Sequence, residues 1–431
     1  LQNRWLKKFA RRKGEPMYQV WYSTESFADY VIDHTNLSTL SPVKWRLYES
    51  DAAKPRNFHS MPDHIRKILY LDAPDLIVQR HNEPLFSIEI STEAGTGHNA
   101  FQRFSRIAAA VENGVPAFYI YPEGVIVTRK TTTPKWDGIN PLIFQALEQV
   151  MDIYGIPALL YYYPSDFAKY QLHPEKAPNF YVKGLRNDAD IVAYSGCPDA
   201  NDAQMQSMFQ AINEILQAVE ERGVFDGRQS LLRNFVFRQQ RDFMQRQFAE
   251  KSNGRSIWEM SPLSAVTLLP TDFLLRYLER YEDASYRIGD LLRQRKHTAL
   301  YQVNARFRGD PYPGALAAID YLICREGKTF EERQKNLVLV FGKIVVDPAH
   351  GTIAIVDEHG SSISDYFKTV QNTETHNLLT LSYHELKNHQ IPRYFMQTRY
   401  GSTYSKAKHI RVFSYFADAI LFPDGSLWRD G

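Results

Sequence analysis

The sequence predicts an α/β protein with a mixed sheet, followed by a large portion that is mostly helical and then α+β. Three observations predict this fold class. Helical and strand-like periodicities alternate between residues 61 and 122. A helix there joins two strands that follow each other, which requires a parallel crossover. Beyond residue 199 the pattern is mainly helical, and strand-like runs return after residue 308.

The segment 61–122 contains, in order, a helix, a strand hairpin, a second helix and a buried strand. Ser60 is a favourable N-cap, and Pro62 lies early in the first helix, where its missing N–H costs little. Asn113 and Gly114 end the second helix. The predicted bounds are a helix over 61–71, strands over 75–79 and 85–92 around a turn over 80–84, a helix over 98–112 and a strand over 115–121.

The rest of the chain gives weaker signals. Helices are expected over 141–154, 201–251, 264–281, 285–301 and 311–324, and strands over 188–194, 337–346, 352–357 and 410–422. We predict an α/β domain over 1–198, with its core at 61–125. A second portion over 199–431, possibly divided near 308, would recognise a substrate.

Composition limits the class of protein. The chain has 431 residues, enough for two or three domains at about 150 residues each. Its formal net charge is +2, so binding to a polyanion would need local basic patches. Two cysteines exclude a disulfide framework and favour a reducing compartment. With no long apolar run, we expect a cytoplasmic protein that does not contact a membrane.

Two acids on the predicted hairpin are the candidate site. Asp75 begins the first strand, and Glu89 lies on the second, where alternate residues share a face. The hairpin would therefore bring Asp75 and Glu89 together. Two converging carboxylates repel each other unless a cation neutralises them or one of them takes a proton. Mg²⁺ accepts such oxygen ligands while keeping positions for water.

The block Pro74-Asp75, a short hairpin, Glu89-Ile90-Ser91, a helix and a buried strand resembles the core of the PD-(D/E)xK nuclease superfamily, which includes most restriction endonucleases. The resemblance implies a restriction-endonuclease-like mixed sheet. It also implies that Asp75 and Glu89 hold Mg²⁺. The family usually has a lysine where this chain has Ser91, so the group that activates water is unassigned.

The residues after Ser91 supply candidates for that group. Glu93 is near in sequence, and His98 and Gln102 stand four apart on one face of the predicted helix. Arg106 extends the same face and, with Arg103, is a candidate phosphate ligand. Further basic residues at 228–255 alternate with phenylalanines, and the candidate DNA contacts among them are Arg233, Arg238 and Arg241.

The resemblance thus implies a Mg²⁺-dependent endonuclease that cuts double-stranded DNA, of the type II restriction or defence kind, acting as a homodimer on a palindromic site. Ser91 supports an alternative, a non-catalytic DNA-binding protein on a degenerate nuclease core. A second alternative is a dinucleotide-binding enzyme, because Gly95 and Gly97 fit the G-x-G-x-x-A pattern between a strand and a helix. A third leaves the acids solvated on an exposed sheet face.

Overall fold

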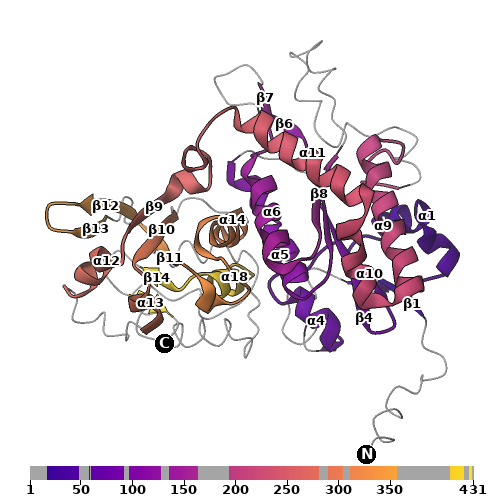
Figure 1. Ribbon diagram of the computed structural model, residues 1–431, viewed down its shortest axis with the longest axis horizontal. Helices are drawn as coiled ribbons and strands as arrows, with labels where there is room; N and C mark the ends of the chain where they lie inside the picture. The colour runs from indigo at the N-terminus through magenta and orange to yellow at the C-terminus, as the bar shows by residue number, and fades with distance from the viewer. Residues whose placement is uncertain are drawn as a thin grey trace, which may run out of the picture.

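The structure is a computed structural model, and it contains two mixed β-sheets with helices packed on them (Figure 1). The α/β class predicted from the sequence is confirmed. The structure describes residues 17–47, 58, 60–91, 97–127, 135–163, 194–280, 290–303, 311–356, 408–421 and 427–429.

The first sheet has six strands in the order β2-β1-β3-β4-β5-β8. β3 and β4 form the antiparallel hairpin that the sequence predicts, and β4, β5 and β8 are parallel neighbours. The strands are β1 (Tyr18–Tyr22), β2 (Val43–Arg46), β3 (Leu76–Arg80), β4 (Glu83–Ile90), β5 (Ala117–Pro122) and β8 (Ala158–Tyr163); β6 (Gly124–Val127) and β7 (Lys135–Gly138) form a separate hairpin.

Helices cover both faces of this sheet. On one face lie α4 (Asp63–Leu69), α5 (Phe104–Glu112) and α6 (Leu142–Tyr154), and on the other α9 (Ala203–Arg222) and α10 (Val224–Ser230), while α11 (Phe235–Ser252) runs past the edge strand β8 and packs on both α6 and α9 (Figure 1). The side chain of Gln240 donates to the Leu160 carbonyl at 2.6 Å and so covers the edge of β8. Because α9 to α11 pack on the first sheet, residues 203–252 group with it by packing, although they lie beyond the predicted boundary at 198.

The second sheet has the order β15-β14-β11-β10-β9. Its strands are β9 (Val266–Pro270), β10 (His297–Val303), β11 (Lys335–Phe341), β14 (Ala419–Leu421) and β15 (Leu427–Arg429), and β12 (Lys343–Asp347) and β13 (Thr352–Val356) form a hairpin beside it. Its helices are α12 (Thr271–Leu278), α13 (Asp290–Gln294), α14 (Pro311–Ile319), which continues as one π-helical turn over Asp320–Cys324, and α18 (Lys408–Phe416). The remaining elements are α1 (Glu25–Asp33) and the 3₁₀ helices η3 (Asn36–Leu40), η4 (Gly97–Phe101), η7 (Leu231–Arg233), η8 (Ile257–Glu259), η9 (Leu263–Ala265) and η11 (Phe330–Glu332).

Several sequence predictions in this half are wrong. The helices expected over 264–281 and 285–301 begin or end as strands, because β9 and β10 pair there. The strand expected over 410–422 is helix α18 followed by β14, and the run 337–346 is divided at Gly342 into β11 and β12. A short apolar run suits a buried helix as well as a strand, so periodicity alone does not separate them. The strand expected over 188–194 lies almost wholly outside the described residues.

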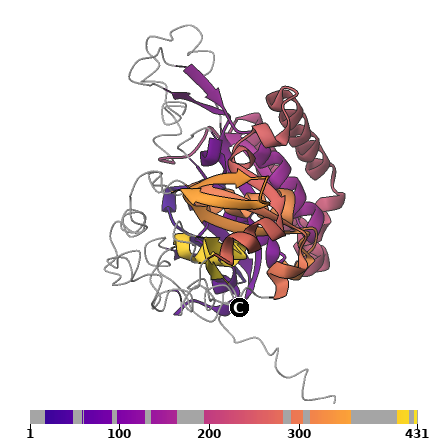
Figure 2. The ribbon, with the colours of Figure 1, turned by 90° about the vertical axis from the view of Figure 1, so that its left-hand side faces the viewer.

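The two halves share a continuous core. Helix α14 packs on α5 and η4, and Gly314 permits this approach because a Cβ there would lie 1.7 Å from the Phe101 carbonyl oxygen. From α18, the buried Arg411 donates to the carbonyls of Tyr70 and Leu71. Figure 2 shows the second sheet in front of the helices on the first, with α18 (yellow) beside it. Helix α5 and the segment before β3, which flank the candidate site, are therefore packed against the second half of the chain.

Candidate functional site

The β3–β4 hairpin brings Asp75 and Glu89 together. Leu76 pairs with Ile88, so the next position places Asp75 opposite Glu89, and directly opposed residues of an antiparallel pair face the same side. Asp75 is tied to the neighbouring strand as well, because its Oδ2 accepts a hydrogen bond from the Ile90 N–H at 2.9 Å. The sequence prediction that these two acids are neighbours on one face is consistent with this register.

Glu89 is buried and makes an ion pair with Arg106 of α5. The Arg106 Nη1 lies 2.9 Å from Oε1 and 3.0 Å from Oε2 of Glu89, and the Glu89 side chain is 2% exposed. The same guanidinium donates through Nε to Asp72 Oδ2 at 2.8 Å. Arg106 therefore joins two buried acids from different segments, a role that the prediction of a phosphate ligand did not include.

The charges around Glu89 have opposing effects. Burial raises the pKa of the Glu89 carboxyl well above its ordinary value, and the negative charge of Asp75 adds to this shift, whereas Arg106 and Arg103 lower the pKa. The negative charges of Glu89 and Asp75 are therefore only partly balanced by the positive charge of Arg106. A divalent cation beside Asp75 and Glu89 would act in the same direction as the two arginines.

The site opens toward solvent at Arg103 and Asp75. The Arg103 Nε lies 3.3 Å from Glu89 Oε1, and its side chain is 23% exposed, compared with 1% for Arg106. Asp75 is also only partly buried. Ser91, in the position of the family lysine, is buried, and its N–H donates to the Ile120 carbonyl at 2.9 Å. Of the two arginines beside Glu89, Arg103 is therefore the one that a molecule in solvent can reach.

His98 and Gln102 are not on one helical face, so that prediction is wrong. Gly97–Phe101 is a 3₁₀ helix and Gln102 lies in the turn before α5, because α5 begins only at Phe104. His98 contacts the C-terminal half: its Nδ1 and the Ser261 Oγ are 2.6 Å apart and hydrogen-bonded, and its ring lies 5.1 Å from that of Tyr312. These contacts make His98 part of the junction between the halves.

We predict a specific pH dependence for His98. Burial lowers its pKa to about 4, and no described residue hydrogen-bonds its buried Nε2. A histidine whose pKa is depressed by folding stabilises the protein above its unfolded pKa of about 6.5, and that stability is lost as pH falls toward 4. Between pH 7 and pH 5 the free energy of unfolding should therefore fall by about 2 kcal/mol more in the wild type than in His98→Gln. Urea denaturation at both pH values measures this, and equal losses would contradict it; the matched control is the exposed His350→Gln.

The remaining candidates fall in different places. Glu93 and Gly95 lie outside the described residues. Gly97 has φ +65°, and its carbonyl accepts from the Asn140 side chain at 3.1 Å, so it supports the turn and the close approach of Asn140.

The basic residues in α11 and in the turn before it differ in exposure and in their partners. Arg233 and Arg238 are exposed. Arg241 instead makes ion pairs with Glu148 and Asp152 of α6, the latter at 2.8 Å. Its predicted DNA contact would have to compete with these two carboxylates, whereas Arg233 and Arg238 remain candidate phosphate ligands.

Sequence reasoning missed a second buried group of charges, in the other half of the molecule. Arg333 pairs with Asp320 at 2.7 Å and with Asp418 at 2.8 Å, and Arg325 lies 2.6 Å from Asp320. Arg325 is also 3.6 Å from Glu112 of α5, so the group reaches the first half. The only signal in the sequence is a concentration of arginines beside apolar runs, which does not show which acids they meet.

No protein-family model, curated protein or solved structure matches the chain. Within the part of the chain that the structure describes, no helix has the length and apolar character needed to cross a bilayer. The same described residues contain no group of three or more potential metal-ligating His, Cys, Asp or Glu side chains.

Proposed function

We propose that the chain is a Mg²⁺-dependent endonuclease with a restriction-endonuclease-like core, acting on double-stranded DNA. The observation that carries the proposal is the hairpin register, which sets Asp75 opposite Glu89 on one face of the sheet. The order of helix, hairpin, helix and parallel strand around the two acids supports it further.

The donor set suits Mg²⁺ without a third acid. This ion keeps several waters and is commonly held by one or two carboxylates plus substrate phosphates. Asp75 and Glu89 would hold it, and Arg106 would remain the buried counter-charge of Glu89. When bound, the metal would lower the pKa of a water and neutralise charge on the scissile phosphate.

The chain's own residues supply the other functions. Arg103, partly exposed beside Glu89, would hold a phosphate oxygen and so supply a cation at a site that lacks the family lysine. The exposed Arg233 and Arg238 would contact the DNA backbone at a distance from the acids. A homodimer would present two such sites to the two strands of a palindrome, and a restriction or defence role belongs to the same proposal.

The second candidate function is DNA binding without cleavage, and one observation favours it. Both oxygens of Glu89 already accept from Arg106, as in a site where a guanidinium has replaced the metal. Incubation of the protein with supercoiled plasmid and Mg²⁺ or Mn²⁺ separates the two. The endonuclease should give nicked or linear DNA, and EDTA should prevent this. Binding in a mobility-shift assay without cleavage under any metal would establish the second candidate instead.

A further inference from the structure

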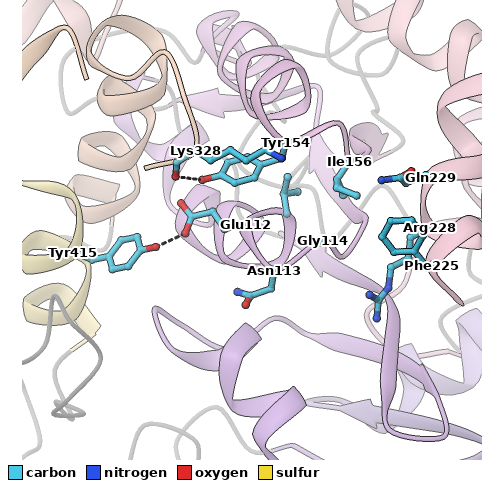
Figure 3. A pocket seen from close by; sticks show the side chains of 11 residues that line it. Glu112, Asn113, Gly114, Tyr154, Ile156, Phe225, Arg228, Gln229, Lys328 and Tyr415 are labelled. Atoms are coloured by element: carbon cyan, nitrogen blue, oxygen red, sulfur yellow. Dashed lines mark hydrogen bonds between the residues drawn. The ribbon is translucent and has the colours of Figure 1, made fainter. Parts of the chain in front are cut away.

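A cavity of about 480 Å³ lies between the two halves, away from Asp75 and Glu89. One wall comes from α10, and the other from the ends of α5 and α6, the segment after the π-helical turn, and α18 (Figure 3). Small-molecule sites have volumes of about 300–1,000 Å³ and are frequent where domains meet. The size and position of this cavity are those of a ligand site.

The cavity has cations on both walls. Arg228 of α10 donates through Nε to the Pro84 carbonyl at 2.6 Å, and no described residue accepts from its two terminal nitrogens. Burial lowers the pKa of this guanidinium and the negative charge of Glu83 raises it, so a further anion nearby would stabilise the charged form of Arg228. Lys328 lies on the opposite wall, where its carbonyl accepts from the Tyr154 hydroxyl at 3.0 Å (Figure 3). An anionic group inside the cavity would therefore be attracted by both cations.

An aromatic ring is placed beside these cations. Phe225 lines the cavity one helical turn before Arg228, and it is 70% exposed, the most exposed of the large apolar side chains described. A phenylalanine ring exposed beside a cavity offers an apolar face on which a flat ligand can stack. Phe225 and Arg228 together thus suit a ligand with an aromatic ring next to a phosphate.

The far end of the cavity is acidic and hydrogen-bonded. The Glu112 side chain is only 9% exposed, its Oε2 accepts from the Tyr415 hydroxyl at 2.5 Å, and its Oε1 accepts from Tyr321. Burial raises the pKa of Glu112. A carboxylate offers about four acceptor sites, so Glu112 has capacity for a donor on a ligand but would repel a second anionic group.

We propose that this cavity binds a nucleoside monophosphate. The base would lie on Phe225, the phosphate between Arg228 and Lys328, and the amino or hydroxyl donors toward Glu112. This site shares no residue with the proposed nuclease site, and its occupation does not depend on cleavage.

Isothermal titration calorimetry of the full chain with the ribonucleoside 5′-monophosphates, in EDTA, tests the proposal. At least one monophosphate should bind more than about tenfold tighter than inorganic phosphate and than its own nucleoside. Phe225→Ala should weaken that binding about tenfold, the scale of losing one base–aromatic stack, and Lys328→Gln should also weaken it.

The matched control is Phe235→Ala, which removes a phenylalanine that is 62% exposed on α11, outside the cavity. It should bind as the wild type does. Absence of binding by every monophosphate at 1 mM (about the upper end of useful affinities) would overturn the proposal. So would equal effects of Phe225→Ala and Phe235→Ala. Because the assay contains no divalent metal, failure here and failure of the nuclease proposal are read separately.

Discussion

Asp75→Asn should reduce Mg²⁺-dependent plasmid cleavage more than about a hundredfold while leaving the protein folded. Even groups outside the immediate metal ligands cost about 10–100-fold when removed, and loss of a ligand charge costs more. Asparagine keeps a side-chain oxygen that can accept from the Ile90 N–H, so the local hydrogen bond survives. Rates of nicking measured against Mg²⁺ concentration check the prediction, with the metal requirement of the variant shifted upward.

Two comparisons make this result specific. Asp242→Asn changes an exposed acid on α11 and should cleave at the wild-type rate. Glu89→Gln should lose activity too, but it leaves Arg106 facing a neutral amide and therefore also lowers stability, so Asp75→Asn is the decisive variant. Cleavage by Asp75→Asn within a few-fold of the wild type would remove Asp75 from the mechanism.

The sequence predicted the hairpin and its acids because these depend on short-range patterns. Period-2 alternation, the short turn expected over 80–84 and the place of Asp75 at the start of the first strand indicate which residues face each other. The same reasoning could not find Asp72 as a partner of Arg106, because that contact joins a loop to a helix 34 residues later and no periodicity records it. Arg106 was predicted to contact phosphate because its position on a helical face does not tell whether the side chain is buried or exposed.

The errors in the second half have a related cause. The runs that became β9 and β10 are short, and their pairing with each other and with β11 decided their conformation. The run that became α18 is also short, and it packs as a helix on α14. Similarly, His98 was expected beside the acids because it follows them closely in sequence. Its ring instead packs on Tyr301 and Tyr312, which lie about two hundred residues further along the chain. No local pattern in the sequence indicates that contact.

Replacement of Arg106 by methionine should lower the free energy of unfolding by about 3–5 kcal/mol near pH 8, the cost of leaving a buried carboxylate without its partner. Arg241→Met is a matched control, since Arg241 also pairs with two acids but its side chain is 33% exposed. That surface arrangement should cost only about 0–1 kcal/mol. Urea denaturation of the two variants and the wild type measures the difference. Equal losses in free energy of unfolding would show that burial of the Arg106 ion pair does not add to its contribution to stability.

The loss in free energy of unfolding caused by Arg106→Met should also become smaller as pH falls. Arg106 lowers the pKa of Glu89, so its removal raises further a pKa that burial has already raised. A carboxyl with a raised folded-state pKa stabilises the protein below its unfolded pKa of about 4.5, and that contribution is lost as pH rises through the folded value. The deficit against wild type should therefore be smaller at pH 5 than at pH 8. A deficit that stays constant over this range would mean that Glu89 remains charged without Arg106, and hence that Arg103 or solvent, rather than the buried pair, satisfies it.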